Sequence, residues 1–234
     1  MKFRYFFIII LVIGIFLQFS RMVRKEDYFS IRQEFSFNKA PAKNTSYKFN
    51  HPQKMLVYYS KGSEQSKRIL NNIQETFKFT KMDYTVKDVS EVVPTAEYDT
   101  FIFATNTFIG FKKEMFDTII KEVNAGKKLI FLSMTPYNPF NNLAGIKNFS
   151  ESVLDDSQGI KFSEKLFPGI DSYSPSSKMV THPVLSNVVL ENDVKIFAKS
   201  DENIPLLWER KIGNGRILYS NVSFFADKIM RGVM

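Results

Sequence analysis

The first marked pattern in the chain is an unbroken apolar run from Tyr5 to Leu17. Basic residues precede it at positions 2 and 4 and follow it at positions 21, 24 and 25. No small-residue cleavage motif follows the run, which favours an uncleaved signal anchor over a secretory signal peptide. The run is short for a membrane span, but its basic flanks can reach the lipid head groups. We therefore predict one transmembrane helix within residues 1–25.

The orientation of this helix depends on its flanks, which carry almost equal positive charge. The positive-inside rule therefore gives little preference. A lone N-terminal apolar segment usually acts as an export signal, so we expect a cytoplasmic N-terminus. The rest of the chain would then lie outside the cell membrane, to which the protein would be localised.

The pattern changes at residue 26. Residues 26–53 are polar and lack strong periodicity, which is typical of a stalk or linker. Residues 54–234 contain regularly spaced apolar positions, and their number suits a single domain. We therefore predict an anchor, a stalk and one folded domain.

Strands and helices alternate in the first half of this domain. Short apolar or alternating runs predict strands, and apolar residues three or four apart predict helices. The predicted strands are residues 55–60, 83–89, 98–105 and 128–133, and the predicted helices are residues 64–77 and 111–125. Ser63 is the expected N-cap of the first helix, and Gly126 is the expected terminator of the second. This order predicts an α/β fold with a mostly parallel sheet and helices on both faces.

The second half of the domain is less regular. Residues 134–183 contain five prolines and are predicted to be rich in loops. A strand is expected at residues 194–199, and a closing β-hairpin at residues 205–211 and 216–221, because Asn214-Gly215 favours a tight turn. A final helix is expected from residue 223.

Composition limits the possible chemistry. The net charge is +8, but the residues after position 25 carry 27 basic and 24 acidic side chains, so the domain has no basic surface of the kind that binds nucleic acid. The chain has no cysteine, which excludes disulfides and thiol nucleophiles. With only two histidines, a zinc site made by this chain is not expected, and we predict no metal or cofactor.

Three segments carry a resemblance to a known fold. They are the strand Tyr98-Asp99-Thr100-Phe101-Ile102-Phe103, the unit from Phe111 to Leu132 with Asn124-Ala125-Gly126-Lys127-Lys128, and the hairpin from Leu206-Leu207-Trp208 to Tyr219. Their order resembles the flavodoxin-like fold of class I glutamine amidotransferases. With Asn221, Asp227-Lys228 and Arg231-Gly232, the chain is similar to a bacterial membrane-anchored family.

The resemblance to that family implies more than a fold. Its members join an N-terminal span and an amidotransferase-like domain to a polysaccharide deacetylase-like domain, and some are encoded with Pel-type exopolysaccharide synthesis proteins. It therefore implies polysaccharide and membrane-bound synthase components as partners. It also implies that this chain corresponds to the N-terminal part of a longer protein.

The sequence departs from the amidotransferases at the nucleophile. Those enzymes attack with a Cys on a strand-to-helix turn, activated by a His and a carboxylate. The turn expected here, Ala104 to Phe108, has no Cys. Thr105 or Thr107 with His182 would be the substitute pair, but the turn lacks the glycines of a nucleophile elbow. We therefore predict no catalytic residues.

Several residues remain candidates for ligand binding. Thr105, Asn106 and His182 are expected at the strand ends, where open α/β sheets bind ligands. Tyr137, Asn138 and Asn141 belong to an aromatic and amide-rich loop that suits a sugar ring, with Tyr173 in the same half of the domain. Each has a structural alternative: a turn histidine fixed by Pro183, and aromatic side chains packed in the core.

Two further motifs have weaker functional interpretations. Ser60 to Ser63 stands where a phosphate loop would, but has one glycine and reads more simply as an ordinary turn. Asp155-Asp156 could serve acid–base or metal chemistry, but is more simply a solvated loop.

The sequence thus supports three functional hypotheses. The first is a non-catalytic accessory domain, outside the membrane, for envelope or exopolysaccharide synthesis or modification. The second is the N-terminal part of a polysaccharide deacetylase or hydrolase. The third is a small-molecule-sensing domain that uses the strand-end crevice.

Overall fold

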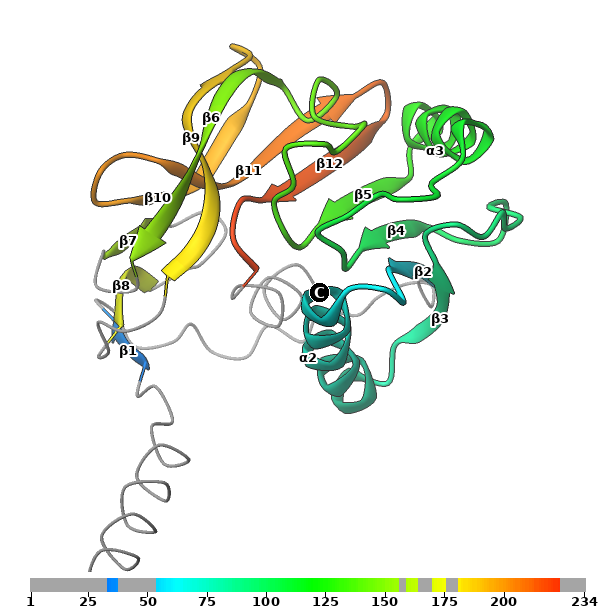
Figure 1. Cartoon of the computed structure of the whole chain (residues 1–234), viewed down its shortest axis with the longest axis horizontal. Coiled ribbons are helices and arrows are strands. Elements are labelled where there is room, and N and C mark those ends of the chain that lie inside the picture. Colours follow the sequence, from blue (N-terminus) through cyan, green and yellow to red (C-terminus); the bar gives the residue numbers. More distant parts are fainter. Residues whose placement is uncertain (1–32, 38–53, 156–158, 164–169, 176–180, 224–234) are drawn as a thin grey trace, which may run out of the picture.

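A computed structural model describes residues 33–37, 54–155, 159–163, 170–175 and 181–223. They form a ten-stranded sheet with the order β1-β8-β7-β10-β11-β12-β5-β4-β2-β3 and a separate two-stranded sheet of β6 and β9 (Figure 1). The predicted span lies outside these residues, as does most of the predicted final helix. Among the described residues, no helix is long and apolar enough to cross a membrane.

One half of the large sheet is parallel and contains the strands that the sequence predicts. Neighbouring strands are joined in register, so that Val57 lies between Val86 and Ile102. Their order, β3-β2-β4-β5-β12, is that of a flavodoxin-like sheet. The strands are β2 (Lys54–Tyr59), β3 (Asp83–Asp88), β4 (Thr100–Phe103), β5 (Lys128–Phe131) and β12 (Gly215–Ser220).

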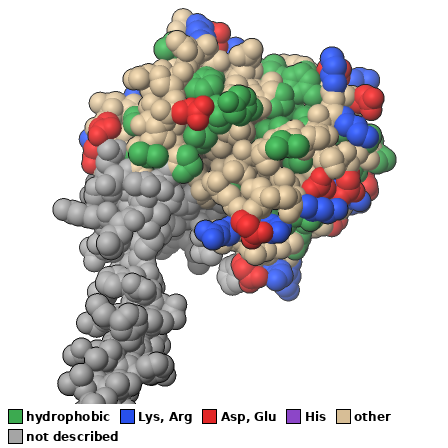
Figure 2. Space-filling model, viewed as in Figure 1, with side chains coloured by type: hydrophobic (Ala, Val, Ile, Leu, Met, Phe, Trp, Pro, Cys, Tyr) green, Lys and Arg blue, Asp and Glu red, His purple; other side chains and the backbone are tan. Residues whose placement is uncertain are grey.

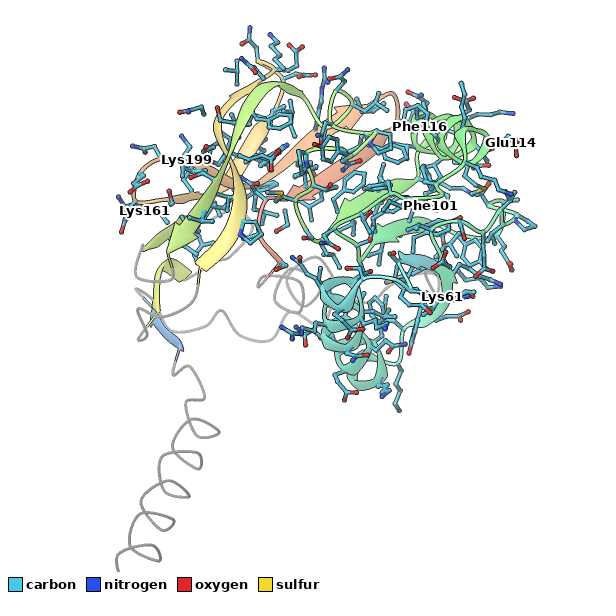
Figure 3. The ribbon with its side chains drawn as sticks, viewed as in Figure 1. Lys61, Phe101, Glu114, Phe116, Lys161 and Lys199 are labelled. Atoms are coloured by element: carbon cyan, nitrogen blue, oxygen red, sulfur yellow. The ribbon has the colours of Figure 1, made fainter. Side chains whose placement is uncertain are left out.

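Two helices cover the opposite faces of this parallel half. Because side chains alternate along a strand, Val57 and Ile102 pack on the side of α2 (Glu64–Thr80), and Tyr58 and Phe103 pack on the side of α3 (Lys113–Ala125). Phe101 and Phe116 belong to the α3 layer (Figure 3). The predicted caps are confirmed: the Ser63 side chain accepts a hydrogen bond from the Ser66 N–H, and Gly126 ends α3 with φ 128°.

The α3 layer contains a row of aromatic rings across five adjacent strands. Tyr58, Phe103, Phe131, Tyr219 and Trp208 occupy matching register positions on β2, β4, β5, β12 and β11. Successive ring centroids are 5.1, 5.4, 5.4 and 4.6 Å apart, and all five side chains are buried. Contacts between rings at these separations stabilise the fold in addition to the stabilisation that comes from burying their apolar surface.

The other half of the large sheet is antiparallel, so the sheet is mixed rather than mostly parallel. The predicted hairpin joins β11 (Pro205–Ile212) to β12, and short connections of this kind require antiparallel strands. The sheet continues through β10 (Lys195–Ser200), β7 (Ile160–Phe162), β8 (Ile170–Pro175) and β1 (Gln33–Phe37). Strand β1 lies within the segment predicted as a stalk and pairs with β8.

The prediction of a loop-rich segment at residues 134–183 was wrong in part. This segment includes β6 (Ile146–Asp155), β7, β8 and the start of β9 (Thr181–Leu190). The pairing of β6 with β9 contains register shifts, and Asn187 has a left-handed backbone with φ 49°. These irregularities break the alternation of apolar and polar residues that would reveal strands in the sequence.

Asn221 joins the two-stranded sheet to the large sheet. Its amide side chain accepts a hydrogen bond from the Leu185 N–H at 2.8 Å and donates to the carbonyl oxygens of Leu185 at 2.8 Å and Pro205 at 2.9 Å. The residue is completely buried. One side chain therefore satisfies three backbone groups of β9 and β11.

The tip of the closing hairpin packs against the C-terminal end of α3. The Asn214 N–H donates to the Asn124 carbonyl oxygen at 3.0 Å. A Cβ atom on Gly215 would lie 2.0 Å from the Val123 carbonyl oxygen, so the close approach requires glycine.

We expect Gly215→Ala to lower the free energy of unfolding by about 2 kcal/mol, because the backbone of α3 must move to admit the methyl group. Gly62→Ala is the matched control, since a Cβ atom there meets nothing within 4 Å. Urea unfolding of both variants checks this expectation, and equal midpoints would contradict it.

We also expect Asn221→Ala to lower the free energy of unfolding by about 2–4 kcal/mol, because it leaves three buried backbone groups without partners. Asn142→Ala, at an exposed position in the loop after β5, is the control and should change stability little. Thermal unfolding followed by circular dichroism distinguishes these outcomes.

Candidate functional site

The C-terminal edge of the parallel strands is the natural place for a site in this fold. From β2 the chain crosses to β3 on one side and then returns to β4 on the other, so the connections diverge between β2 and β4. Open α/β sheets bind ligands outside the strand ends at such a point. The turns Ser60–Ser63 and Ala104–Thr107 meet there.

The polar side chains at these strand ends form hydrogen bonds with one another and with the backbone of the domain. The Ser63 hydroxyl donates to Asn106 Oδ1 at 2.7 Å, and Asn106 Nδ2 donates to Gln65 Oε1 at 2.9 Å. Beneath them, the Ser66 hydroxyl donates to the Ala104 carbonyl at 2.7 Å and accepts from the Ser60 N–H at 2.8 Å. Asn106 is thus placed at the crevice, as predicted from sequence, but its amide group is already bonded.

Thr105 is also engaged locally. Its hydroxyl donates to the Thr107 carbonyl oxygen at 2.8 Å and accepts from the Thr107 N–H at 3.1 Å. The side chain is buried, and α3 begins only at Lys113, so the strand does not turn directly into a helix. The hydroxyl proton therefore points to a backbone carbonyl and not to a base.

His182 lies in β9, where its backbone pairs with Leu154 of β6. Its side chain lies outside the described part of the structure, so the expectation that His182 binds a ligand stays a prediction, and the structure does not test a pair of Thr105 or Thr107 with His182. The side chain of Asp155 and the whole of Asp156 also lie outside the described part of the structure. Tyr173 lies in β8, and its side chain is not described either.

The amide-rich loop after β5 divides into buried and exposed residues. Asn138 Oδ1 accepts from the Phe140 N–H at 2.9 Å, while Asn141 Nδ2 donates to the Pro136 carbonyl oxygen at 3.1 Å. Both asparagines are buried and hold the loop together. Tyr137, between them and Pro136, is 85% exposed.

Tyr219 fixes this loop to the sheet, a role that sequence analysis missed. Its hydroxyl donates to Asn141 Oδ1 at 3.2 Å. Burial raises the pKa of Tyr219, so it stays a neutral donor. Its position in an apolar hairpin strand gave no sign of a polar partner so distant in the sequence.

The loops after β4 and β5 are joined by aromatic packing. Phe140 lies 6.2 Å from Phe108, 5.8 Å from Phe111 and 5.5 Å from Phe103 between ring centroids. The two groups of predicted residues, Thr105 with Asn106 and Tyr137 with its neighbours, therefore lie on adjoining loops. No pattern in the sequence predicts this contact.

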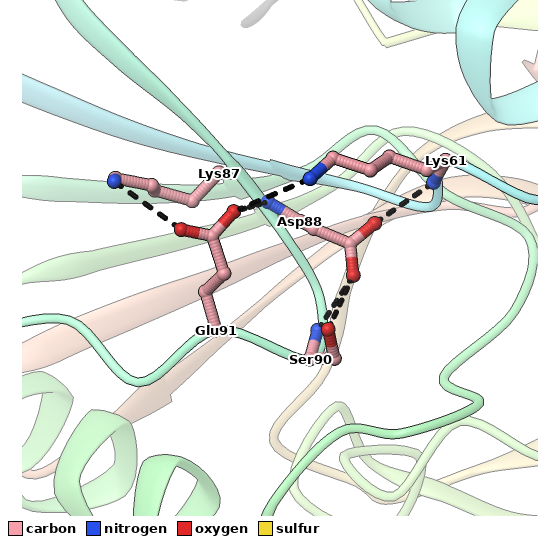
Figure 4. Close-up of polar contacts among 5 residues, drawn as sticks. All are labelled: Lys61, Lys87, Asp88, Ser90 and Glu91. Atoms are coloured by element: carbon pink, nitrogen blue, oxygen red, sulfur yellow. Dashed lines mark hydrogen bonds and ion pairs between the residues drawn. The ribbon is translucent and has the colours of Figure 1, made fainter.

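A cluster of charged residues, which was not predicted from the sequence, lies at the C-terminal end of β3 (Figure 4). Asp88 Oδ2 accepts from the Lys61 N–H at 2.9 Å, and Asp88 Oδ1 accepts from the Ser90 hydroxyl at 2.6 Å. Glu91 accepts from the Asp88 N–H at 3.0 Å and pairs with Lys87 at 3.2 Å. Asp88 and Ser90, two residues apart, are the sequence signal of such a turn.

These contacts lower the pKa of both carboxyl groups, Asp88 and Glu91. Partial burial acts to raise the pKa of Asp88, but hydrogen bonds from Ser90 and Lys61 outweigh it and lower the pKa. The Asp88 N–H and then Lys87 lower the pKa of Glu91. Both groups are therefore ionised at neutral pH and neutralise the lysines beside them. Among the described residues, no group of three His, Cys, Asp or Glu side chains could hold a metal ion.

Comparison with known proteins agrees with this architecture. No protein-family model matches the sequence, and no curated protein matches it. A ThuA-like protein from Parabacteroides merdae has a TM-score of 0.54 at 13% identity, over 77% of this chain and 88% of that one. The domain has an amidotransferase-like fold.

The other similar structures include longer carbohydrate-active enzymes. A β-galactosidase from Bacillus circulans gives a TM-score of 0.55 at 14% identity, over 78% of this chain and 30% of that one. The exo-β-1,4-mannosidase Op5Man5 from an Opitutaceae bacterium gives 0.51 at 13%, over 77% and 33%. The chain thus spans about a third of the length of these enzymes. At such identities the likeness shows the fold alone.

The charged cluster beside β3 gives a test by pH. A carboxyl group whose pKa is lowered by folding stabilises the fold above its unfolded pKa, near 3.9, and loses this effect as the pH falls through its folded value. We expect Asp88→Asn to unfold at lower urea concentration than the wild type at pH 7, and the difference to shrink below pH 4.

Asp83→Asn is the control, because Asp83 is an exposed carboxylate at the other end of β3. Urea midpoints between pH 2.5 and 7 check the expectation. A difference between Asp88→Asn and the wild type that stays constant over this range would contradict the assignment.

Proposed function

We propose that this chain is a membrane-anchored, extracytoplasmic accessory domain for envelope or exopolysaccharide synthesis or modification, and that the domain itself is non-catalytic. It would act by binding and positioning, either the polymer or the membrane-bound components that make it. The proposal combines the apolar run at residues 5–17, the amidotransferase-like fold and the state of the strand-end crevice.

The observation that carries the proposal is that the polar groups of the crevice are bonded to one another. Ser63, Gln65 and Asn106 form a hydrogen-bonded chain, and the Thr105 hydroxyl is held by the Thr107 backbone. A nucleophile must instead be hydrogen-bonded to a base that takes its proton. The sequence also supplies no Cys at any position.

The solved structures support a role beside carbohydrate chemistry. A domain of this fold forms about a third of a β-galactosidase and of an exo-β-1,4-mannosidase, so the fold is used as one part of larger carbohydrate-active enzymes. A shared fold does not fix function, so this supports the class of role and not the reaction.

The occurrence of this fold as one part of larger carbohydrate-active enzymes also favours a second candidate function. If the native protein continues beyond residue 234, this domain would be the N-terminal part of a polysaccharide deacetylase or hydrolase. Sequencing the gene beyond this point, and measuring the mass of the native product by immunoblot, distinguishes the two. The sensor hypothesis is less favoured, because a ligand in the crevice would have to displace the Ser63–Asn106 hydrogen bond.

A complementation experiment tests the main proposal. In the organism that carries the gene, we expect deletion of residues 1–25 to reduce polymer output strongly, because the domain loses its place at the membrane. Thr105→Val, which keeps the side-chain shape but removes the hydroxyl, should preserve output in proportion to the amount of folded protein.

Thr105→Ser is the matched control that retains a hydroxyl. Polymer is measured by sugar analysis and protein by immunoblot of the membrane fraction. Loss of output in Thr105→Val at normal protein level, with rescue by Thr105→Ser, would contradict a non-catalytic domain. Unchanged polymer in a full deletion of the gene would contradict the role in polysaccharide synthesis.

A further inference from the structure

Exposed apolar side chains are concentrated at one edge of the domain. Among the described residues, five large hydrophobic side chains are at least half exposed: Val92 at 52%, Ile109 at 83%, Tyr137 at 85%, Val153 at 62% and Val189 at 50%. The first three follow β3, β4 and β5 directly, at the C-terminal edge of the parallel strands. The two most exposed of the five are among these three.

The loops that carry these three residues touch one another. A Cβ atom on Gly110 would lie 3.1 Å from the Ser90 Cβ, so the loop of Ile109 packs against the loop of Val92. Phe108 and Phe111 pack against Phe140, which joins the loop of Ile109 to that of Tyr137. We call Val92, Ile109 and Tyr137 with their loops the apolar edge.

Hydrogen bonds hold the apolar edge in place. The Ile109 N–H donates to the Thr107 hydroxyl at 3.4 Å, and Thr107 is itself bonded to Thr105. Asn138 and Asn141 fix the loop of Tyr137. Because these loops are constrained, their exposed apolar side chains cannot fold back into the core and remain available to contact a ligand.

The charge around the apolar edge is balanced. Lys87 and Lys61 pair with Glu91, and Lys113 pairs with Asp117 at 2.6 Å. A surface with this balance does not attract a polyanion or an anionic bilayer strongly. Figure 2 shows one face of the domain, on which acidic and basic side chains lie close to one another and hydrophobic side chains lie between them.

We propose that the apolar edge binds an uncharged polysaccharide chain, with the Tyr137 ring stacked on the apolar face of a sugar. This inference rests on the proposed function and names its ligand class. Three inter-strand spacings separate β3 from β5, so the edge is about 14 Å long, enough for a short run of sugars. Ile109 and Val92 would contact further C–H groups of the chain.

The arrangement suits a glycan better than a second copy of the protein. Its apolar side chains are separated by polar residues such as Thr107 and the exposed Ser90, whereas a stable dimer buries a continuous area of about 800 Å² on each partner. An exposed tyrosine supplies a flat apolar ring and a hydroxyl that can bond to sugar hydroxyls.

The test uses the full chain in nanodiscs. Probes are β-1,4-linked oligosaccharides of mannose, galactose and N-acetylglucosamine, and neutral envelope polysaccharide extracted from the organism that carries the gene. We expect retention by at least one probe, a loss of about tenfold in affinity for Tyr137→Ala and a smaller loss for Ile109→Ser. Val153→Ser, exposed on β6 away from the edge, should bind like the wild type.

Three results would overturn the inference. The first is no retention by any probe or by the extract, and the second is equal loss in Val153→Ser. The third is assignment of the edge to another partner. Because the chain has no cysteine, the variant Ile109→Cys can be labelled with a fluorescent dye at that position alone. Quenching of the dye fluorescence by brominated lipid would show that the apolar edge contacts the membrane instead. A dimer that Tyr137→Ala dissociates, seen by sedimentation, would reassign it to a second copy.

The outcome separates this inference from the proposed function. If polymer output needs the gene but no probe binds, the accessory role stands and the glycan edge fails. If probes bind through Tyr137 but the gene has no effect on polymer output, the edge stands and the accessory role fails.

Discussion

The row of aromatic rings across β2, β4, β5, β12 and β11 is the interaction on which the rest of the domain depends. It lies in register across the point where the parallel half meets the antiparallel half, and Tyr219 and Trp208 continue it onto the hairpin. Rings packed in a row on one face tolerate no shift of register, because a slip of one residue would turn each ring to the opposite face. The row therefore fixes how two differently built halves form one sheet.

The same row determines the position of the loops at the strand ends. Phe140 packs on Phe103 and Phe131, and Phe108 packs on Phe103. These contacts hold the loops after β4 and β5 against the row of rings. Tyr219 adds a hydrogen bond to Asn141 from within the row. Exposure of Tyr137 and Ile109 is thus a consequence of core packing beneath them, and not of loose loops.

The sequence predicted the parallel half well because β2, β4 and β5 are largely buried on both faces and appear as apolar runs. The edge strand β3 is predicted by its alternation. The helices α2 and α3 were predicted by their spacing and caps, including Ser63 and Gly126. Strands β6 and β9 were missed because they form a two-stranded ribbon with register shifts, in which Val153 and Val189 face outward. Alternation cannot reveal a strand whose apolar residues do not keep to one face.

The candidate site was predictable in position but not in chemistry. Strand ends placed Thr105 and Asn106 correctly, since that follows from the fold class. The partners of Asn106, Ser63 and Gln65, lie far away in the chain, and only the tertiary structure shows these hydrogen bonds. Thr105 instead bonds to the nearby Thr107 backbone. The charged cluster of Lys61, Asp88 and Glu91 was missed for the same reason.

The two sets of residues at this edge have opposite properties, and the contrast bears on function. The groups that could perform chemistry beside β2 and β4, which are the hydroxyls of Ser63, Ser66 and Thr105 and the amide of Asn106, are hydrogen-bonded within the domain. Groups that can only make contacts, Tyr137 and Ile109, are exposed on constrained loops. A catalytic site requires the reverse, with reactive groups accessible and apolar groups used as walls. This distribution of polarity at the strand ends supports the binding role that we propose.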